Sequence, residues 1–355
     1  MGSTEDYSVD YSDYYDSNFT TEETFQANPT PTVQLVQFLA VIIYSVTCLL
    51  GLVGNGLVIT MIIFEMKKSV SIIWFLNLAA ADFLFNVFLP LNIAYTALGY
   101  HWLFGRGMCK VNSLLLNLNM YTSVFLLTII SLDRYILVVC PVWSQNHRNT
   151  KSAWLACLAV WALGFVMSSP SLVFRDTGLV RDHLICFNNF SMSSSPLDRP
   201  LGDQVHMAVT LTRFVVGFVL PLSVITVCYV VIIVRLKRNR LAKSKKPMKI
   251  IIAIILTFFL CWCPYHVLQL LETQHHSIPE SVLKFGLPIV TAVAASNSCM
   301  NPVLYVFLGQ DFQKFKMTVL SRLASALSED TVHSMIPRRS FTKPSSMTEK
   351  ETILS

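Results

Sequence analysis

The chain has 355 residues, of which 53% are hydrophobic and only 14% are charged. Soluble domains carry roughly 25% charged residues, so this composition excludes an ordinary soluble globular protein and favours a polytopic membrane protein. The formal net charge of +6 does not indicate a nucleic-acid partner, because the basic excess flanks long apolar runs.

Residues 1–34 form an acidic segment in which tyrosines alternate with aspartates and glutamates. It holds too few large apolar groups to fold alone, so we predict a disordered extracellular tail. It is either a solvated tether or an acidic arm, with sulfated tyrosines, that attracts a basic ligand. Asn18 and Asn189 begin glycosylation sequons and are predicted to be glycosylated.

Seven apolar runs follow, and each is long enough for a helix to cross a hydrocarbon core of about 30 Å. Lipid offers the backbone no hydrogen-bond partners, so runs of this length are helices. They cover residues 35–64, 72–98, 107–139, 152–174, 205–234, 249–271 and 284–307. The predicted fold class is an all-α membrane protein, a seven-transmembrane helix bundle within residues 35–308.

Lysine and arginine in the short loops set the orientation of such a bundle. The first 66 residues contain neither, whereas residues 235–249 contain eight and no acid. The N-terminus is therefore predicted to be extracellular, in a multi-pass protein of the plasma membrane.

The third run joins an outer cysteine to an inner charged triplet. Roughly 25 residues, about 37 Å of helix, separate Cys109 from Arg134 of the triplet Asp133-Arg134-Tyr135. Cys186 is the other cysteine predicted at the outer face, and the oxidising exterior favours a disulfide between the two. A membrane-spanning helix with a cysteine at its outer end and an arginine at its inner end suggests a signalling receptor.

Polar side chains inside apolar spans are costly and are therefore candidate functional groups. They are Asn55, Asp82, Asn119, Ser123, Asn297, Ser298 and Asn301. Asn297, Asn301 and Tyr305 share one helix face, with Pro302 beside them. The cluster is either a hydrogen-bond network between helices or a sodium site at Asp82, because a lone buried carboxylate must be protonated, paired or bound to a cation.

A bulky ring lies beside a helix-breaking proline in the sixth run. Pro264 follows Trp262 closely, and Phe258 lies one turn further inward. A proline removes a backbone hydrogen bond and kinks its helix, so the pair is predicted to act as a switch. Simple core packing would place the same residues there.

Arg213 is an arginine in the outer third of the fifth run. It stays protonated and needs an anion, and its planar guanidinium suits the terminal carboxylate of a ligand. Asn117 is predicted at similar depth on the third run. Arg175, Glu272 and Lys284 are predicted around the extracellular mouth of the bundle. The simplest interpretation is that they are ordinary solvated charges at its edge.

The segment after the seventh run has two predicted parts. Residues 309–321 place phenylalanine and leucine at helical spacing between lysines, which predicts a short amphipathic helix on the inner leaflet. Residues 322–355 are rich in serine and threonine and are predicted to be a disordered cytoplasmic tail, with phosphorylation as its functional interpretation.

Taken together, the motifs resemble the rhodopsin-like (class A) G-protein-coupled receptors over about residues 36–320. They are GNGLV, LAAADF, DRY, Trp161, Pro221 with Tyr229, CWCP and NPVLY. Stretches such as WFLNLAAADFLFNVFLP and TFFLCWCPYH resemble the chemoattractant peptide receptors of this class, and the chemerin receptors among them.

This resemblance implies an extracellular ligand of chemerin type, a protein whose processed C-terminal peptide enters the bundle. By position, Arg213, Arg175, Glu272 and Asn117 would line the peptide pocket. The implied intracellular partners are an inhibitory heterotrimeric G protein, arrestin and receptor kinases. No cofactor is implied beyond an allosteric sodium ion.

On the inner side, the resemblance implies that Arg134 meets the G protein when the sixth span swings outward, with Tyr229 and Tyr305 in support. Many members carry an acid at the start of that span, which pairs with the arginine at rest. This chain has Ser244 there. We therefore expect the resting lock to depend on Asp133 alone and the basal activity to be appreciable.

Three other functions compete with a signalling receptor. A non-signalling scavenger receptor would bind and internalise the same ligand, and the intact Asp-Arg-Tyr triplet argues against it. A transporter is disfavoured because the apolar runs contain only two deeply placed charged residues, Asp82 and Arg213. An enzyme is disfavoured because no nucleophile and base are placed together.

Overall fold

The computed structural model describes residues 31–66, 69–180, 183–190, 199–238, 246–273 and 279–308. Asn18, Ser244, the predicted amphipathic helix at 309–321 and the tail at 322–355 lie outside the described residues. So does most of the predicted extracellular tail.

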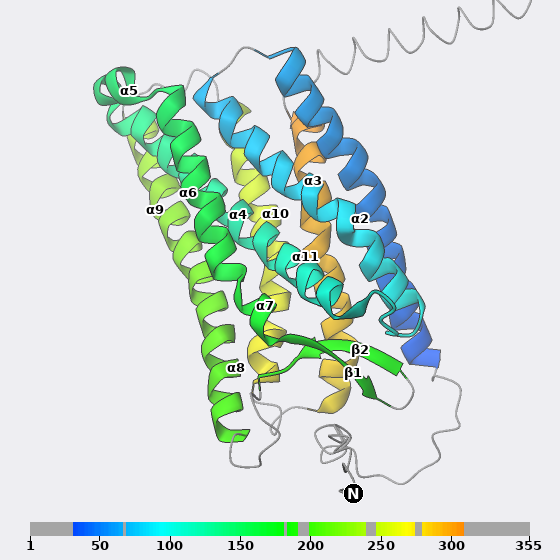
Figure 1. Cartoon of the computed structure of the whole chain (residues 1–355). Helices are drawn as coiled ribbons and strands as arrows, with labels where there is room; N and C mark the ends of the chain where they lie inside the picture. Colours follow the sequence, from blue (N-terminus) through cyan, green and yellow to red (C-terminus); the bar gives the residue numbers. More distant parts are fainter. Residues whose placement is uncertain are drawn as a thin grey trace, which may run out of the picture. The chain divides into compact units, whose positions relative to one another are not determined.

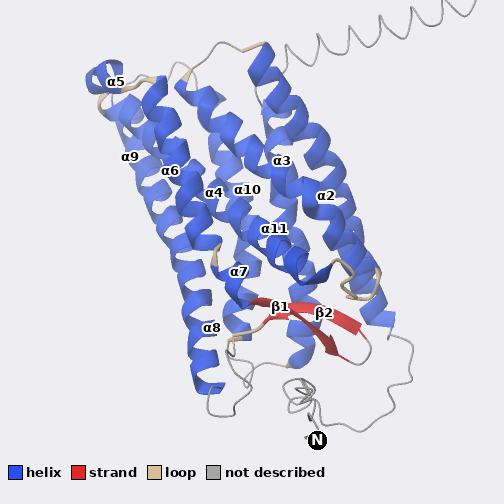
Figure 2. Ribbon diagram, in the orientation of Figure 1, coloured by secondary structure: helices blue, strands red, loops and turns tan. Residues whose placement is uncertain are grey.

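The described residues form helices joined by short connections, with one pair of strands (Figures 1 and 2). In chain order they are α2 Pro31–Phe64, α3 Val70–Ala97, α4 Gly105–Val139, α5 Pro141–His147, α6 Thr150–Ser168, α7 Pro170–Phe174, β1 Arg175–Val180, β2 His183–Asn188, α8 Arg199–Phe214, the π-helix η2 Val215–Val219, α9 Leu220–Arg238, α10 Lys246–Glu272 and α11 Glu280–Leu308.

Seven helical stretches of the described chain are long and apolar enough to cross a membrane. The fourth combines α6 with α7, and the fifth combines α8, η2 and α9. The predicted seven-span bundle is confirmed, and each helical stretch begins a few residues before its predicted apolar run. Hydropathy underestimates these starts because the first turns extend into the polar interface.

A two-stranded antiparallel sheet adds to the helices in the loop after the fourth span (Figure 2). Arg175 lies opposite Asn188 and Thr177 lies opposite Cys186 in its register. A loop that crosses the bundle outside the helices must satisfy its own backbone groups, and a hairpin does so. The prediction of a purely helical chain omitted this element.

The hairpin lies across one end of the bundle, and α5 lies at the opposite end (Figure 1). α4 is the central helix and contacts α3, α6, α9 and the hairpin, while α2 packs against α3 and α11. One helix therefore connects the two ends of the bundle.

Large apolar side chains are exposed on the outward faces of the helices. Leu49 of α2, Leu155 of α6 and Leu260 of α10 are 66%, 68% and 72% exposed. Water would make such surfaces prone to aggregate, whereas lipid matches them. The exposure pattern therefore agrees with a bundle that is embedded in a bilayer.

The fifth span contains a π-helical turn at Val215–Val219, where Leu220 N donates to Val215 O. Pro221 follows directly and cannot donate a backbone hydrogen bond, which favours a widened turn before it. A Cβ on Gly217 would lie 3.0 Å from Met120 Cε, so glycine lets this turn pack closely on α4.

Candidate functional site

At the hairpin end, the guanidinium of Arg213 on α8 meets neutral acceptors from α10. Its Nη1 donates to Tyr265 Oη at 3.3 Å and to Gln269 Oε1 at 3.2 Å. Gln269 Nε2 in turn donates to Glu272 Oε2 at 2.8 Å. Within the described residues, no carboxylate lies within ion-pair distance of Arg213. The half-buried charge therefore lacks a neutralising partner there.

A second arginine enters the same end from the hairpin. Arg175 Nε donates to Ser113 Oγ at 2.7 Å, and its Nη1 donates to Cys186 O at 3.5 Å. Burial lowers the pKa of the Arg175 guanidinium below its ordinary value, Arg213 lowers it further, and Glu272 acts in the opposite direction. Two guanidinium groups and the Glu272 carboxylate therefore gather at this end, and among the described residues Glu272 lies within ion-pair distance of neither arginine.

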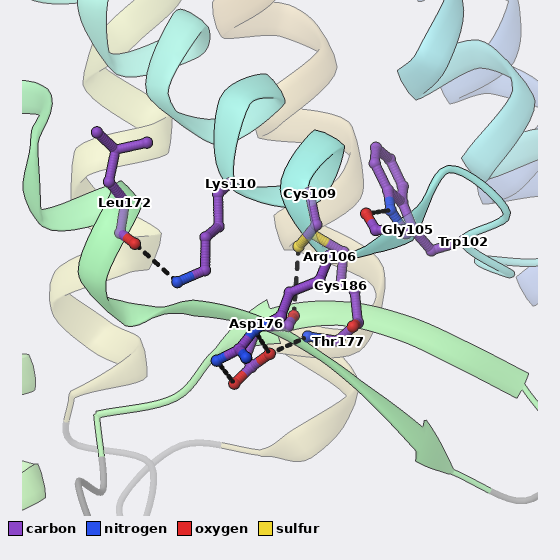
Figure 3. A network of polar contacts seen from close by, with 9 residues as sticks. All are labelled: Trp102, Gly105, Arg106, Cys109, Lys110, Leu172, Asp176, Thr177 and Cys186. Atoms are coloured by element: carbon purple, nitrogen blue, oxygen red, sulfur yellow. Dashed lines mark hydrogen bonds and ion pairs between the residues drawn. A yellow bond between two sulfur atoms is a disulfide. The ribbon is translucent and has the colours of Figure 1, made fainter.

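A disulfide fixes the hairpin that carries Arg175 (Figure 3). Cys109 at the start of α4 is bonded to Cys186 on β2, with 5.7 Å between their Cα atoms, so the predicted disulfide is confirmed. Arg106 forms a two-point ion pair with Asp176 at 2.7 and 3.0 Å. The hairpin is thus attached to α4 through both strands.

Sequence reasoning missed two of the residues that hold Arg213. Tyr265 and Gln269 are one helical turn apart on α10, and Glu272 lies on the next turn. Residues at this spacing share a helix face. Gln269 and Tyr265 lie three and seven residues before Glu272 in the sixth run, and this helical spacing could have identified both from the sequence.

At mid-depth, the Asp82 carboxylate of α3 is fully buried and accepts two amide hydrogen bonds. Asn119 Nδ2 of α4 donates to Oδ1 at 2.8 Å, and Asn301 Nδ2 of α11 donates to Oδ2 at 2.7 Å. Ser123, also of α4, is fully buried beside this carboxylate. The predicted polar residues of three helices therefore meet at Asp82.

Two further asparagines extend this cluster toward α2. Asn55 Nδ2 donates to Gly51 O and to Ser298 O, both at 2.9 Å, so it joins α2 to α11 and not to the carboxylate. Asn86, which sequence reasoning missed, donates from Nδ2 to Ser298 Oγ at 3.0 Å and to Asp82 O at 2.7 Å. Its place one turn after Asp82 in the same apolar run was the available signal.

Several buried amide oxygens of this cluster accept no hydrogen bond from the described residues. They are Oδ1 of Asn55, Asn86, Asn297 and Asn301. Buried acceptors without donors are unfavourable, so a water or a small cation satisfies them best. Of these four side chains, Asn301 is the one whose amide contacts the Asp82 carboxylate among the described residues, so its free oxygen and the carboxylate are the groups that could hold a small monovalent cation.

A row of aromatic rings on α10 leads inward from the mouth. The Tyr265 ring, whose hydroxyl accepts from Arg213, meets Trp262 edge-on at 5.5 Å between centroids. Trp262 is 1% exposed and lies 6.0 Å from the fully buried Phe258. With Pro264 inside the same helix, the rings form a continuous contact from the mouth to the core.

At the inner end, the structure corrects the expectation that Asp133 alone holds Arg134. Arg148 Nε and Nη2 donate to the two oxygens of Asp133 at 2.7 and 3.1 Å. Arg134 Nη2 donates instead to Ser71 Oγ of α3 at 2.8 Å. The expectation was wrong because Arg148, 15 residues after Asp133, packs onto the triplet. Tyr229 of α9 is buried.

The remaining predicted residues lie on α4, on α11 and just after β2. Asn117 is 8% exposed and its amide donates to Ser113 O and Ser171 Oγ, so it faces α7. Lys284 is exposed near the start of α11, Tyr135 and Asn189 are half-buried, and the Tyr305 side chain lies outside what the structure describes. The roles of all these residues in binding, coupling or glycosylation remain predictions.

Comparison with known proteins places this arrangement in a family. Residues 54–305 match the family described as 7 transmembrane receptor (rhodopsin family). The chain is 56% identical over 357 residues to Chemerin-like receptor 1 of Sus scrofa, covering 98% of both chains. It is 55% identical over 340 residues to Chemerin-like receptor 1 of Homo sapiens, covering 93% of this chain and 90% of the relative.

A more distant relative, Chemerin-like receptor 2 of Mus musculus, is 40% identical over 320 residues, which are 89% of this chain and 87% of the relative. Such receptors are multi-pass proteins of the plasma membrane that bind an extracellular ligand and a G protein, and they are not enzymes. The chain therefore belongs to the rhodopsin family of seven-transmembrane receptors and, within it, to the family of the chemerin-like receptors.

Proposed function

We propose that this receptor binds a chemerin-type peptide or protein and signals through an inhibitory G protein, with receptor kinases and arrestin acting on the stimulated form. The names of the relatives support the ligand class. The observation that carries the proposal is Arg213, a half-buried cation held by the neutral oxygens of Tyr265 and Gln269.

A ligand with a free C-terminal carboxylate complements this end of the bundle. A planar guanidinium binds a carboxylate through two parallel charge-assisted hydrogen bonds. The Arg213 contacts are 3.2 and 3.3 Å long, so they are weak enough for a carboxylate to replace. Arg175 of the hairpin adds a second positive charge at this end, and Glu272 can accept from backbone or cationic groups of the peptide.

Tyr265 links this site to the interior. A ligand that moves the Arg213–Tyr265 contact also bears on Trp262 through the edge-on ring contact at 5.5 Å. Signalling requires that the ligand bind the active arrangement better than the resting one, so that ligand and G protein tighten each other's binding. The aromatic row provides the physical contact for this coupling.

Ligand-stimulated inhibition of cAMP in cells tests the proposed function. A synthetic peptide from the C-terminus of chemerin should lower cAMP, and pertussis toxin should abolish the effect. Cells without the receptor provide the control. Uptake of the peptide with arrestin recruitment but no toxin-sensitive response would favour the scavenger alternative. No binding by a receptor shown to be on the surface would reject the ligand assignment.

We also propose that the Asp82 cluster binds a sodium ion that favours the resting receptor. The unsatisfied oxygens of Asn297 and Asn301 and the Asp82 carboxylate support this proposal. Replacing sodium by N-methylglucamine at constant ionic strength should tighten agonist binding by about fivefold or more. Asp82→Asn should remove this difference. Equal affinity of the unmodified receptor in both media would favour a plain hydrogen-bond network.

A further inference from the structure

Arg148 lies between the short helix α5 of the inner loop and α6, which begins the fourth span. It ends α5, where its backbone N donates to Ser144 O at 3.0 Å. The next residue, Asn149, caps α6 by accepting from Ser152 N at 2.8 Å. Both helix ends therefore fix the backbone from which the Arg148 side chain extends.

The Arg148 side chain reaches two helices of the bundle. It binds both carboxylate oxygens of Asp133 on α4, and its Nη2 also donates to Ser71 Oγ on α3 at 2.8 Å. The Asp133 side chain is 9% exposed and that of Arg148 is 24% exposed. A bidentate pair with so little solvent around the carboxylate is stronger and more directional than a surface ion pair.

Arg134 is the neighbour of Asp133 and the other guanidinium of this network. Its Nη2 donates to the same Ser71 Oγ at 2.8 Å, while its Nε is buried without an acceptor among the described residues. One neutral hydroxyl therefore holds Arg134, whereas the carboxylate beside it is bound to Arg148. A hydroxyl holds a guanidinium less strongly than a carboxylate does.

We propose that Arg148 is a positioning residue for G-protein coupling: by occupying the Asp133 carboxylate it prevents an Asp133–Arg134 ion pair and leaves Arg134 available to the G protein. The two guanidinium groups compete for one carboxylate, since Arg148 binds both of its oxygens while Arg134 donates to Ser71. Ser71 orients Arg134 meanwhile. This inference rests on the receptor family and is independent of which ligand the receptor binds.

Arg148→Ala tests the inference in the full-length receptor. Membranes that carry equal amounts of receptor would be mixed with purified heterotrimeric G protein, and GTP exchange measured with and without agonist. Loss of the Arg148 side chain lets Asp133 pair with Arg134, so exchange should fall by about fivefold in both conditions. Arg148→Lys keeps the positive charge but loses the planar two-point donor. Its GTP exchange should therefore lie between that of the unmodified receptor and that of Arg148→Ala.

Lys151→Ala is the matched control, because Lys151 is an exposed cation in the first turn of α6 near Arg148. It should leave GTP exchange unchanged. Agonist binding measured without G protein should be equal for the unmodified receptor and Arg148→Ala, which would show that the bundle and its mouth are intact. Unchanged or increased exchange by Arg148→Ala would overturn the inference.

A second comparison separates positioning from direct contact with the G protein. In receptors that carry Asp133→Asn, no carboxylate remains to be released, so adding Arg148→Ala should change exchange little. If Arg148→Ala lowers exchange equally in both backgrounds, Arg148 acts by contacting the G protein or by supporting the loop, and the inference is wrong.

Discussion

Arg213→Ala should reduce the potency of an agonist with a free C-terminal carboxylate by about 100-fold, which is the scale expected when one partner of a buried charged pair is removed. The same substitution should change the potency of the amidated peptide little, because the amide never formed the ion pair. Concentration–response curves for cAMP inhibition with the two peptides measure both effects.

Arg213→Lys provides the matched comparison for this prediction. It keeps the charge but loses the planar fork, so the free-acid peptide should regain part of its potency. Equal losses for the free-acid and amidated peptides would show that Arg213 supports the pocket through Tyr265 and Gln269 and does not bind the carboxylate.

Cys109→Ser should remove most ligand binding from receptors at the cell surface. The disulfide closes a loop of 77 residues, for which the loss of chain constraint costs roughly 4 kcal/mol. The remaining attachments are hydrogen bonds and the Arg106–Asp176 pair, whose Arg106 side chain is 64% exposed, so Arg175 would be held less firmly in position. Radioligand binding corrected for surface expression measures the loss.

Cys186→Ser should reproduce this loss, because either substitution breaks the same bond. Cys140→Ser is the control, since Cys140 is an exposed free cysteine between α4 and α5. Full affinity in either disulfide variant would mean that the remaining hairpin contacts suffice.

The seven spans and the disulfide followed from the sequence because each depends on local properties. A span needs only a sufficient run of apolar residues, and the disulfide needs two cysteines on the oxidising side. The Asp82 cluster followed for a related reason, because a polar residue inside an apolar run has few alternatives to another polar residue at the same depth.

Contacts that depend on helix rotation and loop packing could not be predicted in this way. Ser71 and Arg148 are 77 residues apart, yet they share a hydrogen bond. Nothing in the local sequence distinguishes Arg148 from an exposed loop cation. The interaction of Gln269 with Arg213 likewise requires knowing which faces of α8 and α10 meet. The hairpin was missed because a short loop carries too few residues for a clear alternation of polar and apolar side chains.

The π-helical turn at Val215–Val219 divides the fifth span into two helical parts. The extra residue rotates the side chains of one part relative to those of the other. Sixteen positions of uninterrupted α-helix would place Arg213 and Tyr229 about 160° apart around the axis, whereas one absorbed residue reduces this to about 60°. The extra residue therefore turns the outer arginine and the inner tyrosine toward the same interior. Without the extra residue Arg213 would point away from Tyr265 and Gln269, so the widened turn is what brings the outer cation to the mouth of the bundle.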